Sequence, residues 1–149
     1  MNSKTRNYGI LAGAGTVIYL LLFYFVNKSY FVNGLVTWSS LIIYLVFMYK
    51  AIIDERNERG GDIEFKDAVR PAFLVYVIAN LIYYSFLYSM FNFFYPELVE
   101  IQREMMEKMG LETEGNNLNM TLSMTFFAFI QSLIAGFAFS AILAAILKR

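Results

Sequence analysis

Long runs of hydrophobic residues dominate this chain, and charged residues are confined to the segments between them. Lys28 is the only charged residue between Arg6 and Lys50, and residues 71–96 and 115–147 contain none. A helix needs about 20 apolar residues to cross a bilayer core of roughly 30 Å. The pattern therefore predicts four transmembrane helices, over about residues 8–26, 31–53, 72–94 and 121–147.

The connection between the first two spans is short. Residues 27–34 read NKSYFVNG and leave room only for a tight hairpin, so we expect the first two spans to be antiparallel neighbours. The first span is long enough to cross the membrane and is followed by no small-x-small cleavage pattern. We therefore expect it to be retained and not removed as a signal peptide.

A charged, amphipathic segment follows the third span. In YPELVEIQREMMEKMG, Pro96 suits a first helical turn and Gly110 suits a C-terminal cap. Apolar residues recur at steps of three and four, with glutamates between them, which predicts an amphipathic helix over about residues 96–109. Its candidate partner-contact residues are Leu98, Glu100, Ile101, Glu104, Met105 and Met109.

Three positions are open to this amphipathic helix. It folds back onto its own bundle, lies on the lipid surface or docks on a partner protein. Surface-seeking helices usually carry Lys and Arg on the polar face. Residues 95–120 instead hold six Glu against Arg103 and Lys108, which favours contact with protein over contact with lipid.

Composition agrees with a membrane protein, because 58% of the residues are hydrophobic, 18% are aromatic and only 16% are charged. We predict an all-α membrane protein in which residues 1–149 form one domain. It has four transmembrane helices, with the amphipathic helix on the outer side between spans three and four. We expect membrane lipids around it and no nucleic-acid partner.

Lys and Arg are distributed unevenly between the two sides of the predicted bundle. Three of the twelve, Lys28, Arg103 and Lys108, lie on the side of the amphipathic helix, and the other nine lie on the side of the two termini. Cytoplasmic loops of membrane proteins collect positive residues. The distribution predicts that both termini are cytoplasmic.

The connection between spans two and three carries mixed charges, which is typical of a solvated loop and not of a polybasic lipid-binding patch. Within it, Gly60 and Gly61 are expected to end the extension of the second span. Asp62 is expected to cap a short helix, and Pro71 to bend or start the third span.

Catalytic chemistry has little support in the sequence. The chain has no cysteine and no histidine, and its twelve acidic residues lie outside the middle of the spans. It also lacks a Gly-rich phosphate-binding motif. We therefore expect no catalytic, cofactor-binding or metal-binding residues, no cofactor and no enzymatic activity.

Small residues recur every four positions along the fourth span. Small residues at this spacing let helix backbones approach closely in lipid. They pack either within the monomer or at a subunit interface. Gly9 and Gly13 form a GxxxG motif in the first span, to which we give little weight because Gly9 lies near the membrane edge. The candidate packing residues of the fourth span are Ala128, Ser132, Gly136, Ser140 and Ala144.

Polar residues recur every four positions along the third span, at Tyr76, Asn80 and Tyr84. An amide facing lipid would remain unsatisfied, so Asn80 is expected to point at another span, with Gln131 as its candidate partner. These residues act as interhelical contacts or line a small cavity or lipid-headgroup pocket. Tyr and Trp near span ends, such as Trp38, are expected to be interfacial anchors.

The chain resembles a known family in three segments: ERNERGGDIEFKDA in the inner loop, FYPELVEIQREMMEKMG after the third span, and the terminal AAILKR. It is similar in these to the bacterial inner-membrane family called domain of unknown function 4199. The likeness covers essentially the whole chain. It implies four spans and a location in the bacterial cytoplasmic membrane, and it implies no activity.

Three functions from different classes are compatible with these features. The one we favour is a small accessory or assembly subunit that packs against a larger membrane protein complex or assembles with itself. The second is a small transporter or a lipid-linked-sugar handling protein that works with a membrane glycosyltransferase. The third is a membrane enzyme with carboxylates at the membrane edge, such as Glu97 and Glu100.

Overall fold

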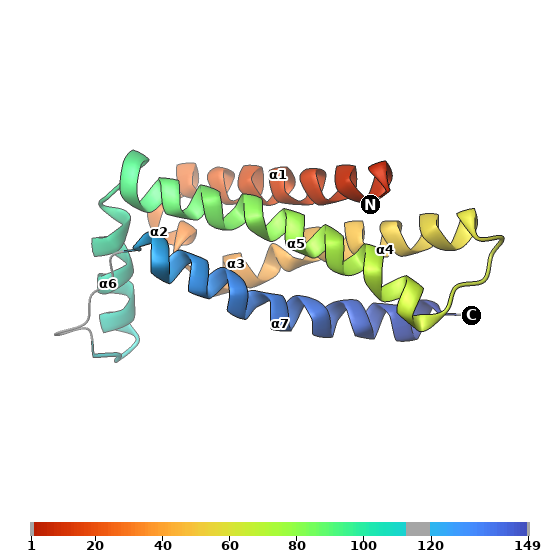
Figure 1. The fold of residues 1–149 in the computed structure, drawn as a ribbon. Coiled ribbons are helices and arrows are strands. Elements are labelled where there is room, and N and C mark those ends of the chain that lie inside the picture. The colour runs from red at the N-terminus through yellow and green to blue at the C-terminus, as the bar shows by residue number, and fades with distance from the viewer. Residues whose placement is uncertain (1, 113–119, 149) are drawn as a thin grey trace.

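The computed structural model describes residues 2–112 and 120–148, which are mostly helical and contain no strand. Four stretches are long and apolar enough to cross a membrane: α1, α3 with α4, α5 with η1, and α7. They run alongside one another, and α6 lies across one end (Figure 1). The predicted all-α membrane protein with four spans is confirmed. The elements are α1 (Ser3–Val26), α2 (Lys28–Phe31), α3 (Gly34–Ser39), α4 (Leu41–Glu58), α5 (Phe65–Ser89), the π-helical turn η1 (Met90–Phe94), α6 (Leu98–Lys108) and α7 (Leu122–Leu147).

The helices extend beyond the predicted spans at the end of the bundle where both termini lie (Figure 1). α1 begins at Ser3, α4 continues to Glu58 and α5 begins at Phe65. Hydropathy identifies only the apolar part of a helix. The additional turns are polar, so they suit the water-exposed end of the bundle. We call this end, which holds the termini and the α4–α5 connection, the terminal end.

Glycines end α4 and α6, as predicted. Gly60 and Gly61 follow α4 with φ of 91° and 103°, and Gly110 follows α6 with φ of 80°. The N–H of Gly61 donates to the carbonyl of Arg56 at 3.0 Å, which completes a Schellman cap. A residue with a side chain would be strained at these left-handed positions.

The start of α5 differs from the prediction. Glu64 occupies the N-cap position without a side-chain cap bond, and Pro71 lies inside the helix. The expected short helix capped by Asp62 is therefore wrong, because α5 begins directly at Phe65. Ile63 is buried in the main core cluster and so anchors the connection just before the helix begins.

The connection between α1 and α4 is built from two short helices, α2 and α3. The Asn27 side chain accepts a hydrogen bond from the N–H of Ser29 at 3.0 Å, and the Asn33 side chain accepts one from Leu35 at 2.8 Å. Asparagine is a favoured N-cap residue, so the two asparagines start the two helices. The antiparallel packing of the first two spans is as expected, since α1 and α4 are in contact.

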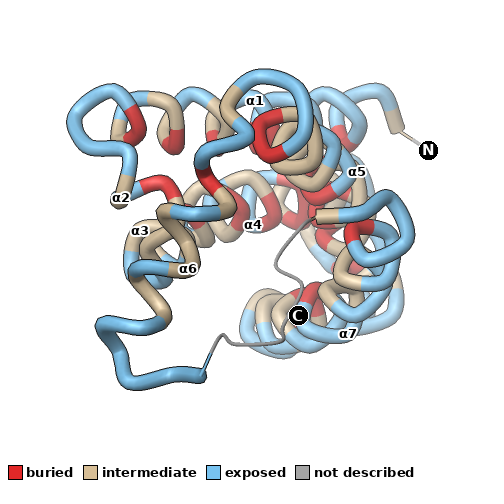
Figure 2. The backbone as a smooth tube through the Cα atoms, turned by 90° about the vertical axis from the view of Figure 1, so that its left-hand side faces the viewer, coloured by how far each residue is buried: buried red, intermediate tan, exposed pale blue. Residues whose placement is uncertain are grey.

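α5 is the central span. It packs against α1, α4 and α7, whereas α1 and α7 make no contact with each other within the described residues. Buried segments gather on the inner sides of the helices (Figure 2), and the outward sides carry exposed apolar residues such as Ile18, Phe25 and Ile134. An apolar outer surface suits lipid. The spans thus assemble around α5.

Glycines allow the closest helix approaches to α5. A Cβ atom added at Gly9 or Gly13 of α1 would lie 2.6 Å from the Cβ of Ile78 or 2.8 Å from the Cβ of Ile82, respectively. The GxxxG motif of the first span is therefore a packing motif, and the little weight that we gave it was wrong. The membrane-edge position of Gly9 does not weaken the contact, because α5 extends to the same depth.

Replacing Gly13 by Ala should destabilise the bundle. The new methyl group would meet the Cβ of Ile82, which cannot move unless the helix backbone moves, so we expect a loss of about 1–3 kcal/mol in the free energy of unfolding. Reversible unfolding in mixed micelles, followed by helicity, measures this loss. The matched control is Gly15→Ala, whose Cβ would lie 3.4 Å from Ile43 and should cost nothing. Equal stability of the two variants would contradict this packing.

Candidate functional site

Asn80 lies midway along α5, and its side chain contacts polar residues of two other spans. Asn80 is only 5% exposed. Its Oδ1 accepts a hydrogen bond from the Tyr44 hydroxyl of α4 at 3.2 Å, and its Nδ2 donates to the Ser132 Oγ of α7 at 2.6 Å. The Ser132 hydroxyl donates in turn to the carbonyl of Phe129 at 2.6 Å. One hydrogen-bonded chain therefore joins three spans.

The prediction that Asn80 points at another span is confirmed, but its predicted partner is wrong. Ser132 takes the place of Gln131, which is exposed on the outer surface of α7. One residue along a helix rotates the side chain by about 100°, so Gln131 and Ser132 lie on different faces. Tyr76 is buried beside this cluster and Tyr84 is half-buried. Tyr44 belongs to the cluster and was not identified from the sequence.

A cavity of about 240 Å³ lies beside Asn80 and is lined by residues of four helices: α3, α4, α5 and α7. Its wall combines hydrogen-bonding and apolar side chains from all four helices. The sequence pattern identified the α5 part of this wall but missed the α3 and α4 part, where Trp38 was expected only to be an interfacial anchor. The polar and aromatic lining residues are Thr37, Trp38, Ser40, Tyr44, Tyr76, Asn80, Tyr83, Tyr84, Ser132 and Phe139.

The small-residue stripe of α7 faces the interior of the same chain. Gly136, Ser140 and Ala144 are buried, whereas Ala128 and Ser132 are half-buried. A Cβ atom at Gly136 would overlap the ring of Tyr76, so the aromatic ring lies directly on the glycine. These contacts agree with the interpretation that the stripe packs within the monomer.

α6 is held to the bundle at its first turn. Leu98 is fully buried in a cluster with Phe31 and Phe91, and Val99 and Ile101 pack against the same cluster. Among the other candidate contact residues, Met105 is half-buried, and Glu100, Glu104 and Met109 are exposed. α6 thus rests on its own chain at one end and is open at the other.

Polar contacts fix the start of α6. The Lys28 Nζ of α2 lies 3.3 Å from the Glu97 Oε1 just before α6. A hydrogen bond from its own backbone N–H, together with the Lys28 ammonium, lowers the pKa of the Glu97 carboxyl, and Glu97 raises the pKa of Lys28. Both side chains are about half exposed, so this ion pair orients the segment more than it stabilises it.

The π-helical turn η1 follows α5 along the chain and is hydrogen-bonded to the residue before the N-cap of α7. The Asn92 side chain donates to the carbonyls of Tyr88 at 3.0 Å and of Met120 at 2.8 Å. Its widened turn closes with a bond from the Tyr95 N–H to the Met90 carbonyl at 2.9 Å. Met120 precedes Thr121, the N-cap residue of α7, so this contact positions both helices that flank α6.

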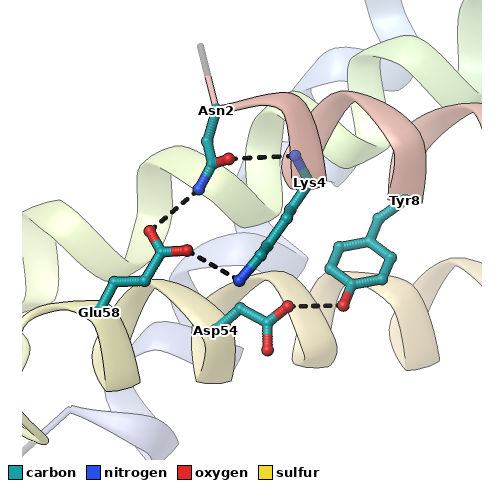
Figure 3. Close-up of polar contacts among 5 residues, drawn as sticks. All are labelled: Asn2, Lys4, Tyr8, Asp54 and Glu58. Carbon is teal, nitrogen blue, oxygen red and sulfur yellow. Dashed lines mark hydrogen bonds and ion pairs between the residues drawn. The ribbon is translucent and has the colours of Figure 1, made fainter.

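The terminal end carries a separate polar cluster that joins α1 to α4 (Figure 3). The Tyr8 hydroxyl donates to Asp54 at 2.6 Å, and the Lys4 Nζ lies 3.0 Å from Glu58. The Asn2 side chain donates to the other Glu58 oxygen at 3.1 Å. Each of these three contacts joins the start of α1 to α4, so we interpret the cluster as a tie between the two helices.

The α4–α5 connection is tied down in the same way. Arg59 pairs with Glu55 at 3.0 Å and with Asp67 at 2.9 Å, while Arg56 donates to the Leu147 carbonyl at 3.5 Å. Its charged residues therefore bridge α4, α5 and the end of α7. The Arg59 side chain stays 45% exposed, so these contacts order a connection that is solvated, as expected.

Acidic residues of the described chain do not form a metal centre, since no group of three or more His, Cys, Asp or Glu side chains is placed to hold an ion there. A family model described as Protein of unknown function (DUF4199) matches residues 7–149. No curated protein and no solved structure matches the chain.

A double-mutant cycle should detect the bond between Asn80 and Ser132. Hydrogen bonds between transmembrane helices couple by about 0.6 kcal/mol on average and by at most about 1.7 kcal/mol. We expect Asn80→Ala and Ser132→Ala to show a coupling free energy in this range when unfolding is measured in mixed micelles. Gln131→Ala is the matched control and should be additive with Asn80→Ala. Equal coupling in the two cycles would contradict the observed pairing.

Proposed function

Because the chain belongs to the family described as proteins of unknown function DUF4199, a description that assigns no activity, we propose a function from the chain's own surfaces. The protein is a small integral membrane accessory or assembly subunit. It packs against a larger membrane protein complex, and α6 is the element that makes the contact.

The observation that carries this proposal is the one-sided attachment of α6. Leu98 in its first turn is fully buried, whereas Met109 just after its last turn is 71% exposed. Leu111, which follows the glycine cap, is 50% exposed. Methionine side chains are flexible and polarisable, and they are frequent in adaptable contact surfaces. The far end of α6 therefore offers apolar side chains that its own bundle leaves uncovered.

The charge of α6 favours a protein partner over a lipid surface. Glu100 and Glu104 are exposed on this helix. Helices that lie on membranes usually meet anionic lipid with Lys and Arg, and an acidic face would be repelled by it. A partner with a basic surface next to an apolar one would complement the exposed part of α6.

We place the protein in the bacterial cytoplasmic membrane, with both termini in the cytoplasm and α6 on the outer side. The terminal end of the bundle carries most of the Lys and Arg residues, including Arg56 and Arg59, and such residues accumulate on the cytoplasmic side. The accessory role and this orientation are consistent, because α6 is then available to partners outside the cytoplasm.

The geometry favours the accessory role over transport of a solute or a lipid-linked sugar. Transport along the polar residues of α5 would need a hydrated path at Asn80. Asn80 is almost completely buried and its amide joins α4 to α7, so it forms the floor of the cavity beside it and does not line a path through the bundle. Glu97, a candidate for an edge-located enzyme, pairs with Lys28.

Charge reversal on α6 tests the docking proposal. The tagged protein is purified in a mild detergent from its native membrane, and proteins recovered at near-equal stoichiometry are quantified by mass spectrometry. We expect the combined Glu100→Lys and Glu104→Lys variant to recover the partner about tenfold less, which corresponds to about 1.4 kcal/mol of binding free energy.

The matched control is Asp62→Lys, which introduces a reversed charge at an exposed position of the terminal end. It should recover the partner as the unmodified chain does. Recovery of the chain alone, or equal recovery of a companion with and without the α6 substitutions, would contradict docking through α6.

A further inference from the structure

The cavity beside Asn80 is accessible from the surface of the bundle that faces lipid. Trp38, which lines it, is 68% exposed, and Ala135, which lines it from α7, is also exposed. All of its lining residues belong to the segments that can cross the membrane. A ligand would therefore enter sideways from the bilayer.

The lining is mostly apolar, with hydrogen-bonding groups among its apolar side chains and no ionic charge among its described residues. Of the residues that the structure describes, no Lys, Arg, Asp or Glu lines it, whereas Thr37, Ser40, Asn80, Ser132 and four tyrosines contribute hydroxyl or amide groups. A phosphate group without a cation partner would carry a large desolvation cost at this depth. An uncharged group with carbonyl or hydroxyl oxygens would instead exchange hydrogen bonds with the lining.

The cavity is large enough to enclose the headgroup of a lipid but not its hydrocarbon chains. About 240 Å³ is below the usual range of roughly 300–1,000 Å³ for sites that enclose a whole drug-sized ligand. A glycerol diester or a quinone ring is of suitable size, while its hydrocarbon chains stay in the bilayer. The apolar lining residues, such as Trp38 and Phe139, would contact the start of those chains.

We propose that this cavity binds the polar end of an uncharged membrane lipid that carries carbonyl or hydroxyl groups. Asn80 and Tyr44 form the polar floor of the site, and Trp38 lies at its mouth. The site includes no residue of α6, so it goes beyond the docking role and does not depend on it.

Trp38 provides a native reporter for this site, because it is the only tryptophan of the chain. The protein is reconstituted in phosphatidylcholine vesicles, and Trp38 fluorescence is titrated with four probes. Two are uncharged: diacylglycerol with brominated acyl chains and a short-tailed benzoquinone. The others are brominated phosphatidic acid and brominated phosphatidylcholine. We expect saturable quenching by at least one uncharged probe and only gradual, non-saturating quenching by the phospholipids.

Two variants on α7 locate the binding. Ala135→Leu narrows the cavity mouth at an exposed position, and Ala138→Leu makes the same change at an exposed position that does not line the cavity. The first should weaken the saturable component at least tenfold, and the second should leave it unchanged. Asn80→Leu should also weaken it, and helicity checks that this variant is folded.

Three results would overturn the proposal. They are the absence of saturable quenching by both uncharged probes, saturable quenching by phosphatidic acid of equal strength, and an equal effect of Ala135→Leu and Ala138→Leu. The first would show that Trp38 senses only the surrounding bilayer, the second that the site does not select uncharged headgroups, and the third that the binding is not in this cavity.

Discussion

The close approach of α1 and α7 to α5 is the contact on which the rest of the structure depends. Gly9 and Gly13 bring the α1 backbone against Ile78 and Ile82, and Gly136 brings α7 against the ring of Tyr76. In lipid the hydrophobic effect does not drive helices together, so van der Waals packing at such close contacts provides much of the stability. α5 can therefore hold three spans at once, although α1 and α7 do not touch within the described chain.

The central position of α5 also determines which polar side chains of the spans can bond to one another. Asn80 lies where α4 and α7 both reach it, so its amide is satisfied by Tyr44 and Ser132. The cavity lies beside this junction. At the terminal end, ion pairs and hydrogen bonds join the helices of the same chain, whereas at the other end α6 is attached mainly through Leu98. The far end of α6 and the cavity mouth are thus two surfaces of the described chain that other molecules can reach.

The sequence was sufficient for the fold class, the four spans, the amphipathic helix and the glycine caps, because hydropathy and backbone conformation are local properties. It was not sufficient to identify hydrogen-bond partners between spans, because these depend on how each helix is rotated about its axis. For this reason Gln131 was predicted as the partner of Asn80 in place of Ser132. The same limit hid Tyr44 and the α3 wall of the cavity, since both require knowing which spans are neighbours. The GxxxG motif of α1 was undervalued because Gly9 lies near the membrane edge, whereas its contact with Ile78 depends on which helix lies beside α1.

The central claim is that the spans pack around α5 within one chain, and cysteine cross-linking between α5 and α7 tests it most directly. The chain has no cysteine, so Tyr76→Cys with Gly136→Cys introduces one defined pair. A Cβ at Gly136 would lie 2.7 Å from Cγ of Tyr76, which brings the two Cβ atoms within range of a disulfide. After oxidation in native membranes, the account predicts a disulfide within the monomer, identified by mass spectrometry of the linked peptides. A product found only as a covalent dimer would contradict it, because the small-residue stripe of α7 would then face a second copy.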